Sequence, residues 1–165
     1  MNVGMACQYQ SYEYMEIGSA EFEQMVQDTL DLIEFANGDE SSEWGKVRVQ
    51  LGHKAPFGLE YLGIGNEQWQ MDNTDFFARY KIFEQRIHAK YPEIKLIGSA
   101  GPDVTSNHYT DAWEFYRKEK KNNPNFDYAI DEHYYMPPKW FLEHNDFYDN
   151  YPRDIKVFAG EYAAH

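Results

Sequence analysis

Apolar residues along this chain fall into two patterns, short continuous runs and longer segments with helical spacing. Continuous runs are typical of strands in a parallel sheet, because such strands are buried on both faces. Four clear runs are expected strands: Leu59–Gly65, Ile94–Ser99, Phe126–His133 and Lys156–Tyr162. Val3–Ala6 is interpreted as the tail of an earlier strand.

Helical segments separate these runs. The first repeats apolar residues at a 3.6 spacing from Phe22 to Ile33, with Ser19 as the expected N-cap and Asn37-Gly38 as the stop. Residues 38–58 are expected to be a long irregular loop. Three more helices are expected: Phe76–Ile87 with a cap at Asn73 or Thr74, Tyr109–Lys121, and one starting at Pro137-Pro138.

Strands that alternate with helices indicate βαβ units and therefore an α/β fold with a parallel sheet. A complete (β/α)8 TIM barrel typically needs about 250 residues, and this chain has 165. We expect residues 1–165 to be a fragment of a single catalytic barrel, from the end of strand 3 through strand 7. The alternative is an open doubly wound sheet. No Gly-rich phosphate loop follows a strand, which disfavours a nucleotide-binding version of that sheet.

Composition excludes several classes of protein. The net charge of −13 argues against nucleic acid as a partner, because phosphate binding needs clustered Lys and Arg. No apolar run reaches the roughly 20 residues that span a bilayer. Residues 1–5 lack the basic and apolar regions of a signal peptide, and the location is left open between secreted or periplasmic and cytoplasmic. The single Cys7 excludes an internal disulfide.

Two runs end in a carboxylate. Glu67 follows Asn66 after one expected strand, and Glu161 follows Gly160 in another. Parallel barrels place catalytic residues at the carboxyl ends of their strands, and glycoside hydrolysis needs two carboxylates that flank the sugar bond. Glu67 is the candidate general acid and Glu161 the candidate nucleophile.

Other side chains are expected near this pair. Asp131–Tyr135 ends a third strand, where His133 and Tyr135 could orient a carboxylate or bind a sugar hydroxyl. Trp69 is either a stacking platform for a sugar or a helix-cap packing residue. A metal held by Asp131 and His133 is conceivable, but no further His or Cys lies at ligand spacing, so no metal is expected.

At these residues the chain resembles glycoside hydrolase family 51, the α-L-arabinofuranosidases. The matching segments follow the order of the family along nearly the whole chain: Gly4–Gln8, Phe57–Glu67, Pro92–Ser99, Asp131–Tyr135 and Val157–His165. The segment around Glu161 resembles the longer members of the family more than the compact ones.

The resemblance implies a retaining (β/α)8 enzyme that removes arabinofuranosyl groups from arabinoxylan, arabinan or arabinogalactan, without a cofactor. It implies that Glu67 is the acid/base, that Glu161 is the nucleophile, and that Asn66 holds the sugar 2-hydroxyl. It also implies that Tyr135 hydrogen-bonds the nucleophile, with His133 nearby. The first barrel strands of the family, its eighth strand and its C-terminal β-sandwich have no counterpart in this sequence, so we expect the isolated chain to be inactive.

Other interpretations remain open at this stage. The chain is alternatively a catalytically incompetent fragment, a carbohydrate-binding module of the same fold, or another glycosidase of the barrel clan such as a β-xylosidase or an endoglucanase. Retention of both Glu67 and Glu161 disfavours a purely binding role. Missing strands would leave open sheet edges, so self-association is expected.

Overall fold

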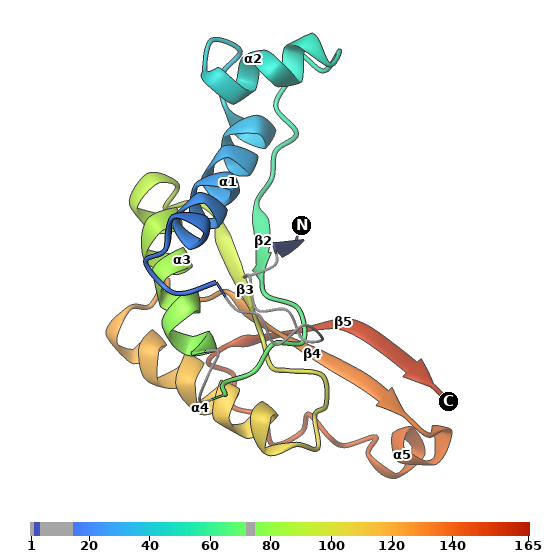
Figure 1. The fold of residues 1–165 in the computed structure, drawn as a ribbon. Coiled ribbons are helices and arrows are strands. Elements are labelled where there is room, and N and C mark those ends of the chain that lie inside the picture. Colours follow the sequence, from blue (N-terminus) through green and yellow to red (C-terminus); the bar gives the residue numbers. More distant parts are fainter. Residues whose placement is uncertain (1, 4–14, 72–74) are drawn as a thin grey trace.

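A computed structural model describes residues 2–3, 15–71 and 75–165. Its five strands form one parallel sheet in the order of the sequence, from β1 to β5 (Figure 1). The elements in chain order are β1 (Asn2–Val3), α1 (Ala20–Asn37), α2 (Glu43–Gln50), β2 (Tyr61–Ile64), α3 (Phe76–Lys90), β3 (Lys95–Ser99), α4 (Asn107–Asn122), β4 (Ala129–Met136), α5 (Pro138–Glu143) and β5 (Lys156–Ala164).

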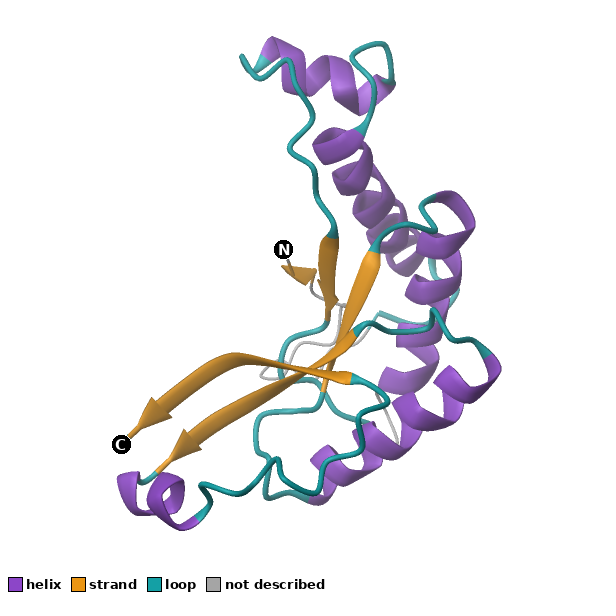
Figure 2. Cartoon of the chain, turned by 180° about the vertical axis from the view of Figure 1, so that it is seen from behind, coloured by secondary structure: helices purple, strands orange, loops and turns teal. Residues whose placement is uncertain are grey.

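The strand order separates the two folds that the sequence left open. A doubly wound sheet reverses its strand order at a switch point, whereas here each strand pairs in parallel with the next along the chain. In the part of the chain that is described, α1, α3 and α4 lie on one face of the sheet (Figures 1 and 2). This arrangement is that of a partial α/β barrel and confirms the barrel prediction.

The expected helices are confirmed, with one addition. Ser19 caps α1 by accepting the amide proton of Phe22 at 3.2 Å, and α1 ends at Asn37 before Gly38. The prediction of an irregular stretch over residues 38–58 is wrong, because α2 lies within it. Ser42 caps α2 through the amide of Gly45. Its weak amphipathic pattern gave no periodic signal, since only Gly45 and Arg48 of this helix are buried.

The expected strands are also confirmed, with shifted bounds. The last strands run further than predicted, because Tyr134–Met136 of β4 pairs with Tyr162–Ala164 of β5. Residues 4–6 of the predicted first strand and the caps Asn73 and Thr74 lie outside the described residues. The residue before α3 is Asp75, in a left-handed conformation and without a side-chain cap.

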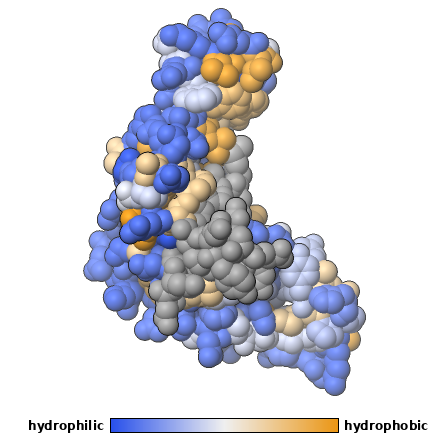
Figure 3. Space-filling model, viewed as in Figure 1, coloured by the Kyte–Doolittle hydropathy of each residue, from blue (hydrophilic) through white to orange (hydrophobic). Residues whose placement is uncertain are grey.

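The core fills the space between the sheet and its helices. Apolar side chains from α1 and α3 pack on Leu62, Ile64, Leu96 and Ile130 of the strands. Burial of such side chains contributes about 1.5–3 kcal/mol each, so this layer fixes the sheet. The helix α2 lies beyond the C-terminal end of α1, away from the carboxyl ends of the strands (Figure 1). Apolar surface gathers near α2, where Leu51 and Phe57 are exposed (Figure 3).

Among residues 2–3, 15–71 and 75–165, no helix covers the opposite face of the sheet, which is the open face (Figures 1 and 2). A cavity of about 480 Å³ is lined there by Gly63, Ile97, Asp131 and Phe158, among others. Alternation along β4 places Ile130, Glu132 and Tyr134 against the helices and the intervening side chains on this open face. In a closed barrel the open face would be the interior.

Candidate functional site

The turn after β2 carries Glu67. Gly65 has φ 85° and Glu67 itself has φ 56°, in the left-handed region that side chains other than glycine seldom adopt. A Cβ on Gly65 would meet the Gln68 side chain at 2.8 Å. Ser99 at the end of β3 donates to the Gln68 carbonyl at 3.3 Å, which ties this turn to the neighbouring strand. A strained backbone held in this way is a common feature of functional sites.

Three residues of β4 face the same open side. Asp131, His133 and Tyr135 are spaced by two, so they share one face of the strand. His133 is only 2% exposed, whereas Tyr135 is 45% exposed. The strand therefore presents a carboxylate, a buried imidazole and an accessible phenol in a row.

A β-bulge places Glu161 opposite this row. Asp131 pairs with Phe158 and His133 pairs with Glu161, so β5 contains one more residue than β4 between these pairs. The Gly160 amide donates to Asp131 Oδ1 at 3.0 Å. Glu161 consequently lies across from His133, on the open face.

The side chains converge on the two glutamates. His133 Nδ1 is 2.8 Å from Glu67 Oε1 and 3.7 Å from Glu161 Oε2. The Tyr135 hydroxyl donates to Glu161 Oε2 at 2.6 Å. One carboxylate oxygen of Glu67 lies within 4.8 Å of one of Glu161. The glutamates are 36% and 40% exposed, so a substrate can reach both.

The charge on His133 is set by its neighbours. Burial by itself would lower the pKa of this imidazole, but hydrogen bonds to Asp131 and Glu67 and the negative charges of Asp131 and Glu161 raise it to about 9. At neutral pH the His133 ring therefore carries a positive charge. The hydrogen bond to Glu161 also raises the pKa of Tyr135, so this phenol stays a donor.

The same atoms have a geometry that suits a metal. Glu67, His133 and Glu161 each offer one ligand atom, and these atoms lie within 4.8 Å of one another. The sequence argument against a metal considered only Asp131 and His133, and it did not foresee that both glutamates approach the ring. In the structure His133 Nδ1 is hydrogen-bonded to Glu67 Oε1, and Glu161 Oε2 accepts from Tyr135. A metal would bind here only after His133 has lost a proton.

The two other predicted residues lie beside this cluster. The backbone amide of Asn66 donates to the side-chain oxygen of Gln68, and Asn66 is exposed. Trp69 stacks on His108 with ring centroids 4.9 Å apart. Trp69 thus borders the connection between β3 and α4.

Glu132 is a polar centre that the sequence did not single out. It points to the helix side of β4 and is fully buried. Five aromatic side chains donate to its carboxylate: Tyr109, Trp113, Tyr134, Tyr148 and Tyr151. Glu132 therefore holds α4 and residues 148–151 behind the strand that carries His133 and Tyr135.

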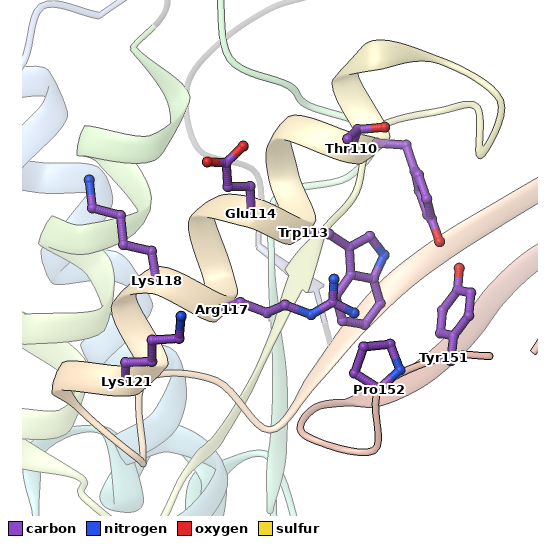
Figure 4. A pocket seen from close by; sticks show the side chains of 9 residues that line it. Thr110, Trp113, Glu114, Arg117, Lys118, Lys121, Tyr151 and Pro152 are labelled. Carbon is purple, nitrogen blue, oxygen red and sulfur yellow. The ribbon is translucent and has the colours of Figure 1, made fainter.

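A larger hollow lies on the helix side, away from the glutamates. It measures about 590 Å³ and is lined by α4 and by Tyr151 and Pro152 (Figure 4). Arg117 lies over the ring of Trp113 at 4.5 Å, and its Nε is 3.2 Å from Asp154. These contacts use the guanidinium to fasten α4 to the segment before β5. The candidate catalytic residues are all on the other face of the sheet.

Comparisons with known proteins identify the family of this chain. The family described as "Alpha-L-arabinofuranosidase 1 domain" matches residues 1–153. The chain is 47% identical over 140 residues to an extracellular exo-α-L-arabinofuranosidase of Streptomyces chartreusis, covering 84% of this chain and 16% of that protein. It is 35% identical over 139 residues to α-L-arabinofuranosidase 2 of Arabidopsis thaliana, covering 84% of this chain and 18% of that protein.

Solved structures give the same result for the fold. An arabinose-bound GH51 α-L-arabinofuranosidase superposes with a TM-score of 0.71 at 26% identity, covering 99% of this chain and 23% of that one. A family 51 α-L-arabinofuranosidase from Bifidobacterium longum has a TM-score of 0.63 at 16% identity over 84% of this chain and 34% of its own, which supports the fold alone. The described helices include none long and apolar enough to cross a membrane.

The chain spans about a sixth of the length of the first curated relatives that it matches. Within that span the family match covers β1 through α5 and ends before β5. On this match, the chain belongs to the α-L-arabinofuranosidase family, glycoside hydrolase family 51.

Proposed function

We propose that the protein containing this chain is a retaining glycoside hydrolase that removes terminal α-L-arabinofuranosyl residues. Its substrates would be arabinose-containing polysaccharides such as arabinoxylan, arabinan or arabinogalactan. Relatives named as α-L-arabinofuranosidases support this activity. Because this chain covers a small part of those relatives, the proposal concerns the protein to which these residues contribute.

One observation carries the mechanism. An oxygen of Glu67 lies within 4.8 Å of an oxygen of Glu161. Retaining glycosidases hold their two carboxyl groups about 5–5.5 Å apart, whereas inverting enzymes leave about 6.5–9.5 Å for a water molecule. The short separation supports direct attack by one carboxylate on the sugar.

In the proposed reaction Glu161 attacks the anomeric carbon while Glu67 gives a proton to the departing glycosidic oxygen. The bond to the leaving group breaks as an ester forms between the sugar and Glu161. Glu67 then takes a proton from water, and that water displaces Glu161 and releases arabinose. The Tyr135 hydroxyl, which donates to Glu161 at 2.6 Å, orients the attacking carboxylate.

The remaining predicted residues keep supporting roles in this proposal. Asn66, exposed beside Glu67, would bind the sugar 2-hydroxyl. His133 would hold Glu67 in place through its 2.8 Å contact. Trp69 would border the region that receives the polymer, packed on His108.

The test is turnover of an aryl α-L-arabinofuranoside. It should be measured on the 165-residue chain and on a chain extended at both ends, each with Glu161→Ala as the matched variant. We expect the extended chain to turn over and its Glu161→Ala variant to be inactive. A denatured-protein mass shifted by one arabinosyl unit, seen with a slow substrate and absent in Glu161→Ala, would identify the covalent ester.

Three results would contradict the proposal. Turnover that is unchanged by Glu161→Ala would remove Glu161 from the reaction. An inactive extended chain that still binds arabino-oligosaccharides would favour a carbohydrate-binding module. Release of xylose or glucose in place of arabinose would favour another glycosidase of the same fold.

A further inference from the structure

The face on which Glu161 lies is decided by the β-bulge in β5. Successive side chains of a strand point to opposite faces, so shifting the pairing by one residue exchanges the faces. In a regular ladder, the residue opposite His133 would be Gly160, because Asp131 pairs with Phe158. Glu161 would then point toward the helices. The extra residue in β5 turns it to the open face instead.

Asp131 contacts this bulge directly. A bulge leaves backbone groups without their ladder partners, and here the Gly160 amide donates to Asp131 Oδ1 at 3.0 Å. A Cβ on residue 160 would lie 2.3 Å from the same oxygen. The contact therefore requires an acceptor oxygen on the side chain of residue 131 and a glycine directly before Glu161.

The second carboxylate oxygen of Asp131 contacts His133, and His133 in turn contacts Glu67. Asp131 Oδ2 is 3.3 Å from His133 Nε2, and His133 Nδ1 is 2.8 Å from Glu67 Oε1. An imidazole with acceptors at both nitrogens donates from both and is then a cation. Asp131 thus supplies the acceptor that fixes the ring orientation and balances the charge of a side chain that is only 2% exposed.

We propose that Asp131 is a positioning residue for the pair of glutamates. One oxygen of Asp131 holds the bulge that presents Glu161, and the other holds the imidazole that contacts Glu67. The inference rests on the proposed glycosidase function for its kinetic consequences, while its geometric content is independent of activity.

The decisive variant is Asp131→Asn in the longest active chain that contains these residues. The amide oxygen of Asn can still accept from Gly160, so the bulge is retained. The amide nitrogen then faces His133 Nε2 in place of an acceptor and carries no charge. We expect kcat to fall by roughly 10–100-fold, the range seen when groups that orient a catalytic ligand are lost, with a smaller change in KM.

A second readout does not depend on turnover. NMR titration of the His133 ring should shift to lower pH by roughly 1–3 units in Asp131→Asn, because an adjacent carboxylate favours the cation by that amount. His133→Gln identifies the resonance. Asp127→Asn is the matched control, since it makes the same change at a buried Asp of the segment that precedes β4. It should leave kcat and the His133 titration unchanged.

Gly160→Ala tests the other half of the contact. The added methyl group would displace Asp131 from the bulge, so kcat should fall while the charge at position 131 is preserved. Gly58→Ala is the control for a glycine-to-alanine change without a clash, because an added Cβ there meets nothing within 4 Å. Urea unfolding of each variant establishes that the folded state is being compared.

The outcomes separate the two proposals. An unsubstituted extended chain without turnover would contradict the glycosidase proposal, and the His133 titration would still decide the role of Asp131. A wild-type His133 titration together with a wild-type kcat in Asp131→Asn would overturn the positioning role. A lower His133 titration with a lower kcat would support it.

Discussion

Tyr135 and His133 lie two residues apart on β4 and approach Glu161 from the same side. Tyr135 donates at 2.6 Å to the oxygen that His133 Nδ1 approaches at 3.7 Å. Tyr135 is partly exposed and stands outside the core, whereas His133 is enclosed. Loss of the Tyr135 side chain should therefore lower the reaction rate, whereas loss of the His133 side chain should also lower the stability of the fold.

Tyr135→Phe should lower kcat by about 10–100-fold with little change in stability. A hydrogen bond to a charged group contributes about 1.5–3 kcal/mol, and the lost hydroxyl donates to Glu161. Initial rates on an aryl α-L-arabinofuranoside measure the effect. Tyr162→Phe, on β5 and 73% exposed, is the control and should behave as wild type. Equal rates for both variants would show that Tyr135 does not orient the nucleophile.

Asp127 gives a pH dependence of stability with a defined sign. It is 2% exposed, and burial raises its pKa from 3.8 to about 6 against the opposing effect of Lys120. As the pH rises, Asp127 loses its proton in the unfolded chain before it does so in the folded chain. The free energy of unfolding should therefore fall between about pH 4 and pH 6 and stay lower above that. Asp127→Asn should remove this loss and gain at most about 3 kcal/mol at pH 7.5.

Urea unfolding at pH 4.5 and pH 7.5 measures the effect of Asp127. The gain from Asp127→Asn should be full at the higher pH and about a third of that at the lower, where the unfolded chain has begun to ionise. The exposed Asp149→Asn is the control for removal of one negative charge from an acidic protein. A gain of equal size at both pH values would contradict the assignment to Asp127 ionisation.

At the scale of elements, the buried carboxylate of Glu132 connects the helix side of β4 to its neighbours. Glu132 accepts from Trp113 of α4 at 2.8 Å and from Tyr151 at 3.0 Å, among other donors. Burial raises the pKa of Glu132, while the hydrogen bonds from Tyr134, Trp113 and Tyr148 oppose that rise. The contacts join α4, β4 and the segment before β5, so the position of the catalytic strands depends on them.

Glu132→Gln should lower the free energy of unfolding by about 2–4 kcal/mol. The Gln amide group would replace an acceptor with a donor among hydroxyl groups, which leaves buried groups unpaired. Denaturant unfolding measures the loss, and Glu114→Gln, the same change at an exposed position of α4, should be close to neutral. An unchanged midpoint in Glu132→Gln would mean that this polar centre does not stabilise the fold.

At the scale of the whole molecule, the sheet has a covered face and an open face. Helices α1, α3 and α4 cover the first (Figure 2). Phe158 is 49% exposed on the open face, and Tyr162 is exposed further along β5, the edge strand of the described sheet. Open edges and apolar faces favour association with another chain or with further strands.

The 165-residue chain should therefore associate as its concentration rises. Sedimentation velocity over a wide concentration range should give a rising weight-average coefficient. Tyr162→Lys should weaken association, since edge charges oppose strand pairing. Leu142→Lys, exposed on α5 away from the sheet edge, should not. A concentration-independent monomer in the unsubstituted chain would contradict this prediction.

The sequence by itself determined the parallel α/β pattern and the candidate glutamates. Unbroken apolar runs and 3.6-residue spacing are local properties, so Ser19 as a cap and Glu67 at a strand end could be predicted directly. The helix α2 could not, because it buries few residues and has no periodic stripe to detect.

Only the tertiary structure decided how the candidate residues meet. The β-bulge, the contact of Asp131 with Gly160, and the five donors around Glu132 depend on pairing between distant segments. A pairing offset of one residue changes which face a side chain occupies, yet it leaves no mark in the local apolar pattern. The sequence therefore named Glu161 and His133, while the packing of β4 against β5 placed them within 3.7 Å of each other.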